Sequence, residues 1–427
     1  MIETGWEDGM VRRARPATSV ANGGKETMRA LQIVFLCAAI ALAAVISAPA
    51  AWAKEPPWKS LPEVAPTGEL SEIGGYTSDP RHTDWKPPKF VYDPDAATKP
   101  KLARVIVIIY NPVLESEGGV KMIDHFKWND PRQYSHILAN TIEQCSGGYI
   151  HYDIVDFIEL DEYPVKIDGY QLTDELYLEL RKDTEKAHQP DRSNYRTIFE
   201  KNGLIERIQK EGITEVWMWG PGWFGFDELA MYIPNRYARF APTDNPWFYR
   251  PYEIPPECGR TVWVMGFNPE VGPDNMIHSY SHRVESIIAL QFGRGIWDKD
   301  LRGKDPWNTF TSLEVDNPGK PSHVGNCHVP PNGESGYDYN NSRRVMSYAD
   351  NWFDYPDLTR RPPRLIGSDE WGNNQFGYQE WLLSHIPHRE GYTEWGYNNW
   401  WVYIANTDED LPDYKPTEPS TFKAPQK

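Results

Sequence analysis

Residues 105–110 read VIVIIY, and this run decides the expected fold. Five of its six residues are Val or Ile, so apolar side chains fill successive positions instead of every second one. Such a run is typical of a strand that is buried on both faces of a parallel sheet. Further strand patterns at 149–160, 213–219 and 261–267 alternate with helical patterns. The sequence therefore predicts an α/β domain over residues 101–293, with a mainly parallel open sheet and flanking helices.

The helices between these strands carry start and stop signals. Asp130 followed by Pro131 is typical of a helix N-terminus, and Gly147 is expected just after the end of that helix. Thr173 is expected to cap a second helix. Residues 195–211 are expected to form a third helix.

The stretch 273–293, PDNMIHSYSHRVESIIALQFG, predicts a long helix after the last strand. Asp274 is expected to cap its start, and Gly293 is expected to follow its last turn. Ligands of open α/β sheets bind beyond the carboxyl ends of the strands. The loop 268–274 leaves the strand 261–267 at that edge, so the helix should begin at the binding edge of the sheet.

Three polar side chains share one face of this helix. His278, His282 and Glu285 stand at i, i+4 and i+7, and at about 100° per residue they fall within roughly 60° of one another. Two imidazoles and a carboxylate arranged in this way offer a divalent metal several ligands. The alternative is a buried structural network in which the histidines hydrogen-bond to Glu285 and to the backbone.

Residues 323–350, HVGNCHVPPNGESGYDYNNSRRVMSYAD, are the second informative stretch. They supply His328 as a third metal ligand beside His278 and His282, with Glu285 as the alternative third ligand. Three protein ligands and an open position are typical of catalytic zinc. We therefore expect zinc or another divalent metal here.

A metal used in hydrolysis needs a carboxylate that takes a proton from the attacking water. Glu285 is the first candidate, provided that His328 completes the ligand set. Otherwise Glu334, Asp338 or Glu228 would have to take this role.

The H-x-x-x-H motif at 278–282, followed at a distance by Val-Met-Ser-Tyr at 345–348, resembles the metzincin branch of the zinc metallopeptidases. These enzymes combine a two-histidine helix with a later methionine turn under the metal. The resemblance implies that Met346 lies beneath the metal and that Tyr348, a candidate catalytic residue, lies near it. Ser279 stands where the H-E-x-x-H motif has its glutamate, and a third histidine six residues after the second is absent.

The composition narrows the possible partners. A net charge of −17 argues against nucleic acid or an anionic membrane as partner, because phosphate contacts need a basic face. No strand is followed by a Walker sequence, and we do not expect a nucleotide cofactor. The 18 Trp and 24 Tyr are compatible with a glycan-handling protein and also with large aromatic cores.

Residues 28–53, MRALQIVFLCAAIALAAVISAPAAWA, have the pattern of a secretory signal with an A-x-A cleavage site at 51–53. Met28 is then the expected start, and residues 1–27 an upstream extension. The protein is expected to be secreted or periplasmic.

Three cysteines remain after such a signal, Cys145, Cys258 and Cys327. One disulfide and one free thiol are the simplest expectation for an exported protein. Because Cys258 and Cys327 flank segments that should converge on the site, we expect these two to pair. Cys145 is expected to be a buried helix residue.

The rest of the chain divides by composition. Residues 54–100 are expected to form an extended Pro-rich arm, and residues 408–427 a disordered tail. Residues 294–407 are rich in Trp, Asn, Pro and Gly and should form a loop-rich subdomain that covers the site. Two short helices are expected within it, at 375–384 and 398–404.

These observations predict an exported metal-dependent hydrolase that acts on an extracytoplasmic peptide or polysaccharide. The alternative is a non-catalytic secreted protein that binds carbohydrate or a surface through its Trp-rich C-terminal part. A glycosidase without metal is a third possibility, although no acid pair stands out by spacing. A serine hydrolase is not supported, because no G-x-S-x-G sequence is present. The oligomeric state is left open.

Overall fold

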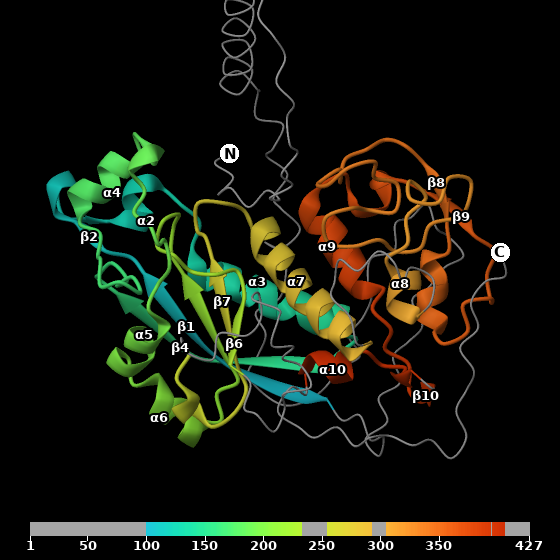
Figure 1. The fold of residues 1–427 in the computed structure, drawn as a ribbon, viewed down its shortest axis with the longest axis horizontal. Helices are drawn as coiled ribbons and strands as arrows, with labels where there is room; N and C mark the ends of the chain where they lie inside the picture. Colours follow the sequence, from blue (N-terminus) through green and yellow to red (C-terminus); the bar gives the residue numbers. More distant parts are fainter. Residues whose placement is uncertain (1–99, 233–253, 293–304, 394, 406–427) are drawn as a thin grey trace, which may run out of the picture. The chain divides into compact units, whose positions relative to one another are not determined.

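A computed structural model describes residues 100–232, 254–292, 305–393 and 395–405 (Figure 1). These residues all belong to one compact unit, Gly68–Lys427. The expected signal at 28–53, nearly all of the expected arm and the expected tail lie outside the described residues.

A five-stranded sheet forms the centre of the fold, and it confirms the predicted α/β class. In spatial order its strands are β4 (Ile150–Leu160), β1 (Lys101–Tyr110), β5 (Glu215–Trp219), β7 (Val262–Phe267) and β6 (Ala230–Tyr232). The first four are parallel, and β6 pairs antiparallel with β7. β6 was not expected, because three residues are too few to show a periodic pattern.

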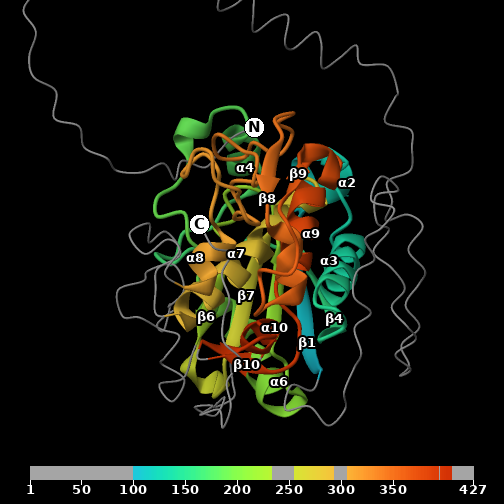
Figure 2. The ribbon, with the colours of Figure 1, turned by 90° about the vertical axis from the view of Figure 1, so that its right-hand side faces the viewer.

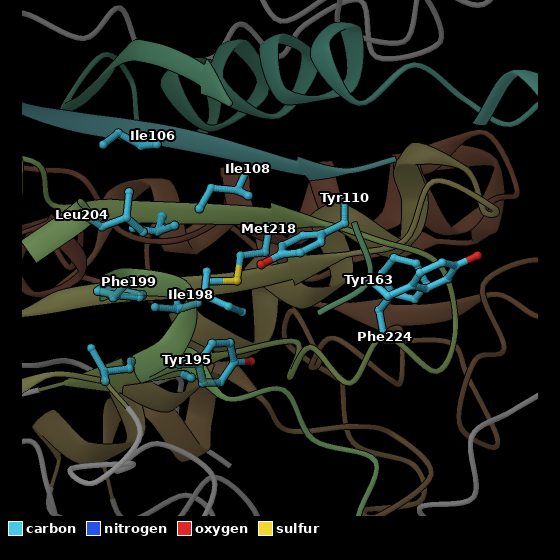
Figure 3. Close-up of a cluster of buried hydrophobic side chains, with 14 of the residues drawn as sticks. Ile106, Ile108, Tyr110, Tyr163, Tyr195, Ile198, Phe199, Leu204, Met218 and Phe224 are labelled. Carbon is cyan, nitrogen blue, oxygen red and sulfur yellow. The ribbon is translucent and has the colours of Figure 1, made fainter. Parts of the chain in front are cut away.

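Strand β1 is buried on both faces over residues 105–110, as its sequence predicts. Ile106, Ile108 and Tyr110 enter one apolar core, shown in Figure 3, together with side chains of the helices that cover this face. The opposite face of the sheet packs on other helices, since the Trp219 indole donates a hydrogen bond to the hydroxyl of Ser135. Helices therefore cover both faces of a mainly parallel sheet, as this architecture requires.

The helices of this part are α2 (Met122–Phe126), α3 (Pro131–Cys145), α4 (Asp174–Leu180), α5 (Tyr195–Lys201), α6 (Leu204–Glu211) and α7 (Pro273–Gln291). The two predicted caps are confirmed, because the side chains of Asp130 and Thr173 accept hydrogen bonds from backbone N–H groups of α3 and α4. The single helix expected over 195–211 is wrong. Gly203 adopts a left-handed φ of 63° between α5 and α6, and a right-handed helix cannot continue through that conformation.

The helix expected over 273–293 is present as α7. It begins at Pro273, so Asp274 lies in its first turn and not at the cap. An acidic side chain in the first turn still interacts favourably with the helix dipole. Gly293 lies outside the described residues.

The C-terminal part combines short elements with long loops. They are α8 (Pro306–Phe310), β8 (Val345–Ser347), β9 (Arg364–Ile366), α9 (Gln375–Ser384), β10 (Tyr392–Thr393), β11 (Gly396–Tyr397) and α10 (Trp401–Ala405). Helix α9 matches its predicted range, whereas α10 begins three residues later than expected. Figure 2 shows α9 alongside α3 and α7, and residue contacts join it to both. Among the described residues, no helix has the length and apolarity needed to span a membrane.

The disulfide expected between Cys258 and Cys327 is wrong, because both thiols are free and buried. Cys258 belongs to the apolar core of Figure 3, on the face of the sheet that α5 and α6 cover. Cys327 instead contacts His282 of α7. Position along the chain could not show that the two residues pack in different surroundings. Cys145 is a buried residue of α3, as expected.

Candidate metal centre

Four side chains that can ligate a metal converge beside α7. They are His278, His282, Cys327 and His328, and their ligand atoms all lie within 4.8 Å of one another. Helix α7 supplies the first two, one turn apart, and the loop after α8 supplies the other two. Imidazole nitrogen and cysteine sulfur are ligand types that zinc favours. The group could therefore hold a metal ion.

The three imidazoles surround a common point. Their ring centroids are 4.7 Å apart between His278 and His282, 4.8 Å between His282 and His328, and 5.1 Å between His278 and His328. The His278 and His328 rings are stacked, and the His282 ring stands nearly perpendicular to both. Helix α7 can present these polar groups because its apolar residues Ile277 and Val284 are buried and anchor the helix.

The loop that carries Cys327 is held by backbone hydrogen bonds. The Cys327 N–H donates to Glu285 Oε1 at 2.8 Å, and its carbonyl accepts from Gln379 Nε2 at 2.7 Å and from the Tyr339 hydroxyl at 2.6 Å. Its Sγ lies 3.3 Å from His282 Nδ1. These contacts place the thiol against the histidines, and they also place the imidazole of the next residue.

Two of the imidazoles favour the neutral form that binds metals. Burial, followed by the neighbouring His282 and His328, holds the pKa of His278 well below its usual value. Burial and the neighbouring His282 lower the pKa of His328 to about 4. Burial acts in the same direction on His282, but the hydrogen bond to Glu285 and the charge of Glu228 outweigh burial and raise its pKa. A histidine binds a metal as the neutral imidazole. The rings of His278 and His328 therefore favour the metal-binding form near neutral pH.

Glu285 lies behind His282, buried at 3% exposure. Its Oε2 is 3.5 Å from His282 Nδ1, and its Oε1 accepts the Cys327 N–H. Burial opposes ionisation of Glu285, but the hydrogen bonds from His282 and Cys327 lower its pKa. A carboxylate behind a ligating histidine orients the ring and raises its basicity.

Two other predicted acids, Glu334 and Asp338, lie in the same turn and contact each other. Asp338 Oδ2 accepts hydrogen bonds from the Glu334 N–H at 3.0 Å and from Asn341 Nδ2 at 2.7 Å. The group of convergent ligands among the described residues contains neither Glu334 nor Asp338.

The Val-Met-Ser-Tyr segment consists of strand β8 and the residue that follows it. Met346 is on β8 and is 42% exposed. The ring of Tyr348 lies 5.5 Å from the ring of His323, a histidine outside the convergent group.

One member of the group and two of its neighbours were not anticipated. Cys327 was expected in a disulfide, although its position directly before His328 was a signal that the two could act together. Tyr337 places its hydroxyl 3.3 Å from His328 Nε2 and has a left-handed φ of 63°, which no sequence pattern indicated. Gln379 reaches His278 from α9 across 101 residues of sequence, a separation that leaves no local signal.

Comparison with family models, with curated proteins and with solved structures finds no match to this chain. Functional inference therefore rests on the geometry of the site and on its chemistry.

Proposed function

We propose that this protein is an exported zinc-dependent hydrolase in which His278, His282 and His328 hold the metal. The observation that carries the proposal is the convergence of these three imidazoles, with the buried Glu285 behind one of them. Zinc favours nitrogen and sulfur ligands, and a site with three protein ligands keeps a position for substrate or water. A bound zinc ion would supply Lewis-acid polarisation and lower the pKa of water.

Glu228 is the carboxylate that we assign to proton transfer. It is exposed, two residues before β6, and its charge acts on both His282 and the buried Cys327. Glu285 is less suited to this role because it already accepts from the Cys327 N–H and faces His282. A general base needs free access to the attacking water, which an exposed carboxylate beside the centre has.

The proposed substrate is an extracytoplasmic peptide or glycan. The two-histidine helix supports a peptide, through its resemblance to metallopeptidases. Tyr337 supports either class, because it is 56% exposed, lies against His328 and can stack on a sugar ring or on an aromatic side chain.

Metal analysis of the purified protein tests the centre. We expect one zinc per chain, lost in His278→Ala and retained in His136→Ala, because His136 is an exposed histidine of α3 outside the group. Hydrolysis of peptide and polysaccharide panels should then stop when a chelator is added and return with zinc. Protein that contains no zinc and still binds polysaccharide would instead support the non-catalytic alternative.

A variant of Cys327 tests whether the zinc centre is catalytic or structural. Four tight protein ligands are typical of structural zinc, and the thiol is near enough to be the fourth. In Cys327→Ser we expect zinc to be retained by three histidines and hydrolysis to persist. Loss of zinc from this variant would favour a closed structural site.

A further inference from the structure

Gln379 is a fully buried glutamine that touches two residues of the candidate metal centre. It lies on α9, and its Nε2 is 2.7 Å from the Cys327 carbonyl and 3.2 Å from His278 Nδ1. Its Oε1 is buried and has no hydrogen-bond partner among the described residues. An unsatisfied buried acceptor is costly, and in native proteins it calls for an explanation.

Packing alone does not explain this glutamine. The buried residues Leu382 and Leu383 of the same helix show that apolar side chains fill the neighbouring positions. A leucine or methionine at position 379 would occupy similar space without an unsatisfied oxygen. The amide therefore has a role that depends on its hydrogen bonds.

The amide controls which nitrogen of His278 carries the proton. A side-chain N–H that points at Nδ1 requires a lone pair there, which places the proton of the neutral ring on Nε2. Binding of a metal through Nε2 requires the opposite tautomer, with the proton on Nδ1. That proton then needs an acceptor.

A half-turn of the Gln379 amide supplies this acceptor. The turn replaces the N–H at His278 by Oε1, the atom that is now without a partner. In this turn the amide N–H groups leave the Cys327 carbonyl, which keeps the hydroxyl of Tyr339. That carbonyl must then shift away from the incoming Oε1, because two acceptor oxygens repel each other at the present 2.7 Å distance. An amide at position 379 can thus serve the metal-free and the metal-bound ring in turn, which an apolar residue cannot do.

We infer that Gln379 is a positioning residue for the metal centre: it sets the tautomer and orientation of His278 and joins α9 to the Cys327 loop. This inference rests on the proposed metal-dependent function. The hydrogen-bond partners of ligating histidines commonly contribute 10–100-fold to metal affinity, by fixing ring and tautomer.

The zinc dissociation constants of three variants, measured by competition with a chromophoric chelator, test this role. Gln379→Leu should weaken zinc binding by about 10–100-fold, because the Nδ1–H of His278 then lacks an acceptor. Gln379→Glu should keep wild-type affinity, because a protonated carboxyl group can donate to the Cys327 carbonyl and accept from His278. The control Leu383→Ala should lower the melting temperature and leave the affinity of the folded protein unchanged.

The ring-nitrogen chemical shifts of His278 give a readout that packing would not change. We expect Nδ1 to carry a lone pair in the zinc-free wild type and a proton in the zinc-bound wild type. Wild-type protein that fails to bind zinc would overturn the proposed function. Wild-type protein that binds zinc, with Gln379→Leu at equal affinity or with all three variants equally weakened, would overturn the role of Gln379 alone.

Discussion

Helix α7 takes part in two buried polar clusters that differ in how their charges are matched. In the first, Arg283 Nη1 lies 2.8 Å from Glu215 Oε2, and both side chains are 2% exposed. The Trp217 indole donates to the same carboxylate at 2.9 Å, and the Tyr152 hydroxyl donates to that of Tyr280 at 2.9 Å. We call these residues the ion-pair cluster.

The second cluster is the candidate metal centre. Its three imidazoles and one thiol bring donor atoms of the same kind together, with Glu285 as the acid that directly contacts them. A cation already sits among acceptors in the ion-pair cluster, as in a structural network. The metal centre instead gathers nitrogen and sulfur atoms that can each ligate a cation. Burial alone therefore does not tell the two apart, whereas charge matching does.

The largest expected effect comes from breaking the ion-pair cluster. Arg283→Met leaves the Glu215 carboxylate buried without its partner, and we expect the free energy of unfolding to fall by about 3–5 kcal/mol in urea titrations. Zinc affinity of the folded protein should be unchanged. The double variant Arg283→Met/Glu215→Gln should recover most of the loss. A single variant with wild-type stability would show that the cluster is not a matched network.

The next largest expected effect on stability comes from His323, a histidine outside both clusters. Burial lowers the pKa of His323 to about 3, and its Nδ1 accepts from the Trp352 indole at 3.1 Å, so the folded state holds it neutral. The unfolded chain takes up a proton below about pH 6.5, so the stability from His323 is complete above that pH and is lost as pH falls toward 3.

Between pH 7 and pH 4 this loss is on the order of 3 kcal/mol. The unfolding free energy of His323→Gln, which keeps an acceptor for Trp352, should therefore depend less on pH than that of the wild type. Equal pH dependence in the two proteins would mean that the folded state binds this proton.

Added zinc should stabilise the folded protein through the metal centre and not through the ion-pair cluster. A ligand that binds only the folded state at 100 times its Kd adds about 2.7 kcal/mol of stability. We expect this increase in wild-type protein and in Arg283→Met, but not in His278→Ala. Thermal unfolding with and without zinc measures it. An equal increase in His278→Ala would place the ion elsewhere.

The smallest expected effect on stability comes from the removal of one tyrosine hydroxyl. Tyr152→Phe removes the hydrogen bonds of this hydroxyl to Tyr280 at 2.9 Å and to Glu215 Oε1 at 3.3 Å, and it should cost about 1–2 kcal/mol with unchanged zinc affinity. Tyr339→Phe removes the 2.6 Å hydrogen bond to the Cys327 carbonyl and should cost a similar amount. Only the second variant should also weaken zinc binding, because its partner belongs to the metal centre. Equal zinc affinities in the two variants would contradict this difference between the two clusters.

The strands were predictable where local pattern was strong. The VIVIIY run of β1 and the caps at Asp130 and Thr173 act over a few residues, so the sequence shows them directly. The break at Gly203 was missed because a glycine inside a helical pattern does not reveal its φ. The short edge strand β6 was missed because its pairing with β7 is a tertiary contact.

The candidate site also has a part that local pattern predicts and a part that only tertiary contacts determine. Helical geometry alone places His278, His282 and Glu285 on one face, because their spacing is set by the backbone of α7. Cys327, His328 and Gln379 join them only through the packing of a loop and of α9, which depends on contacts between residues tens of positions apart. Local periodicity thus accounts for which side chains α7 offers, and long-range packing decides which donors complete the group around them.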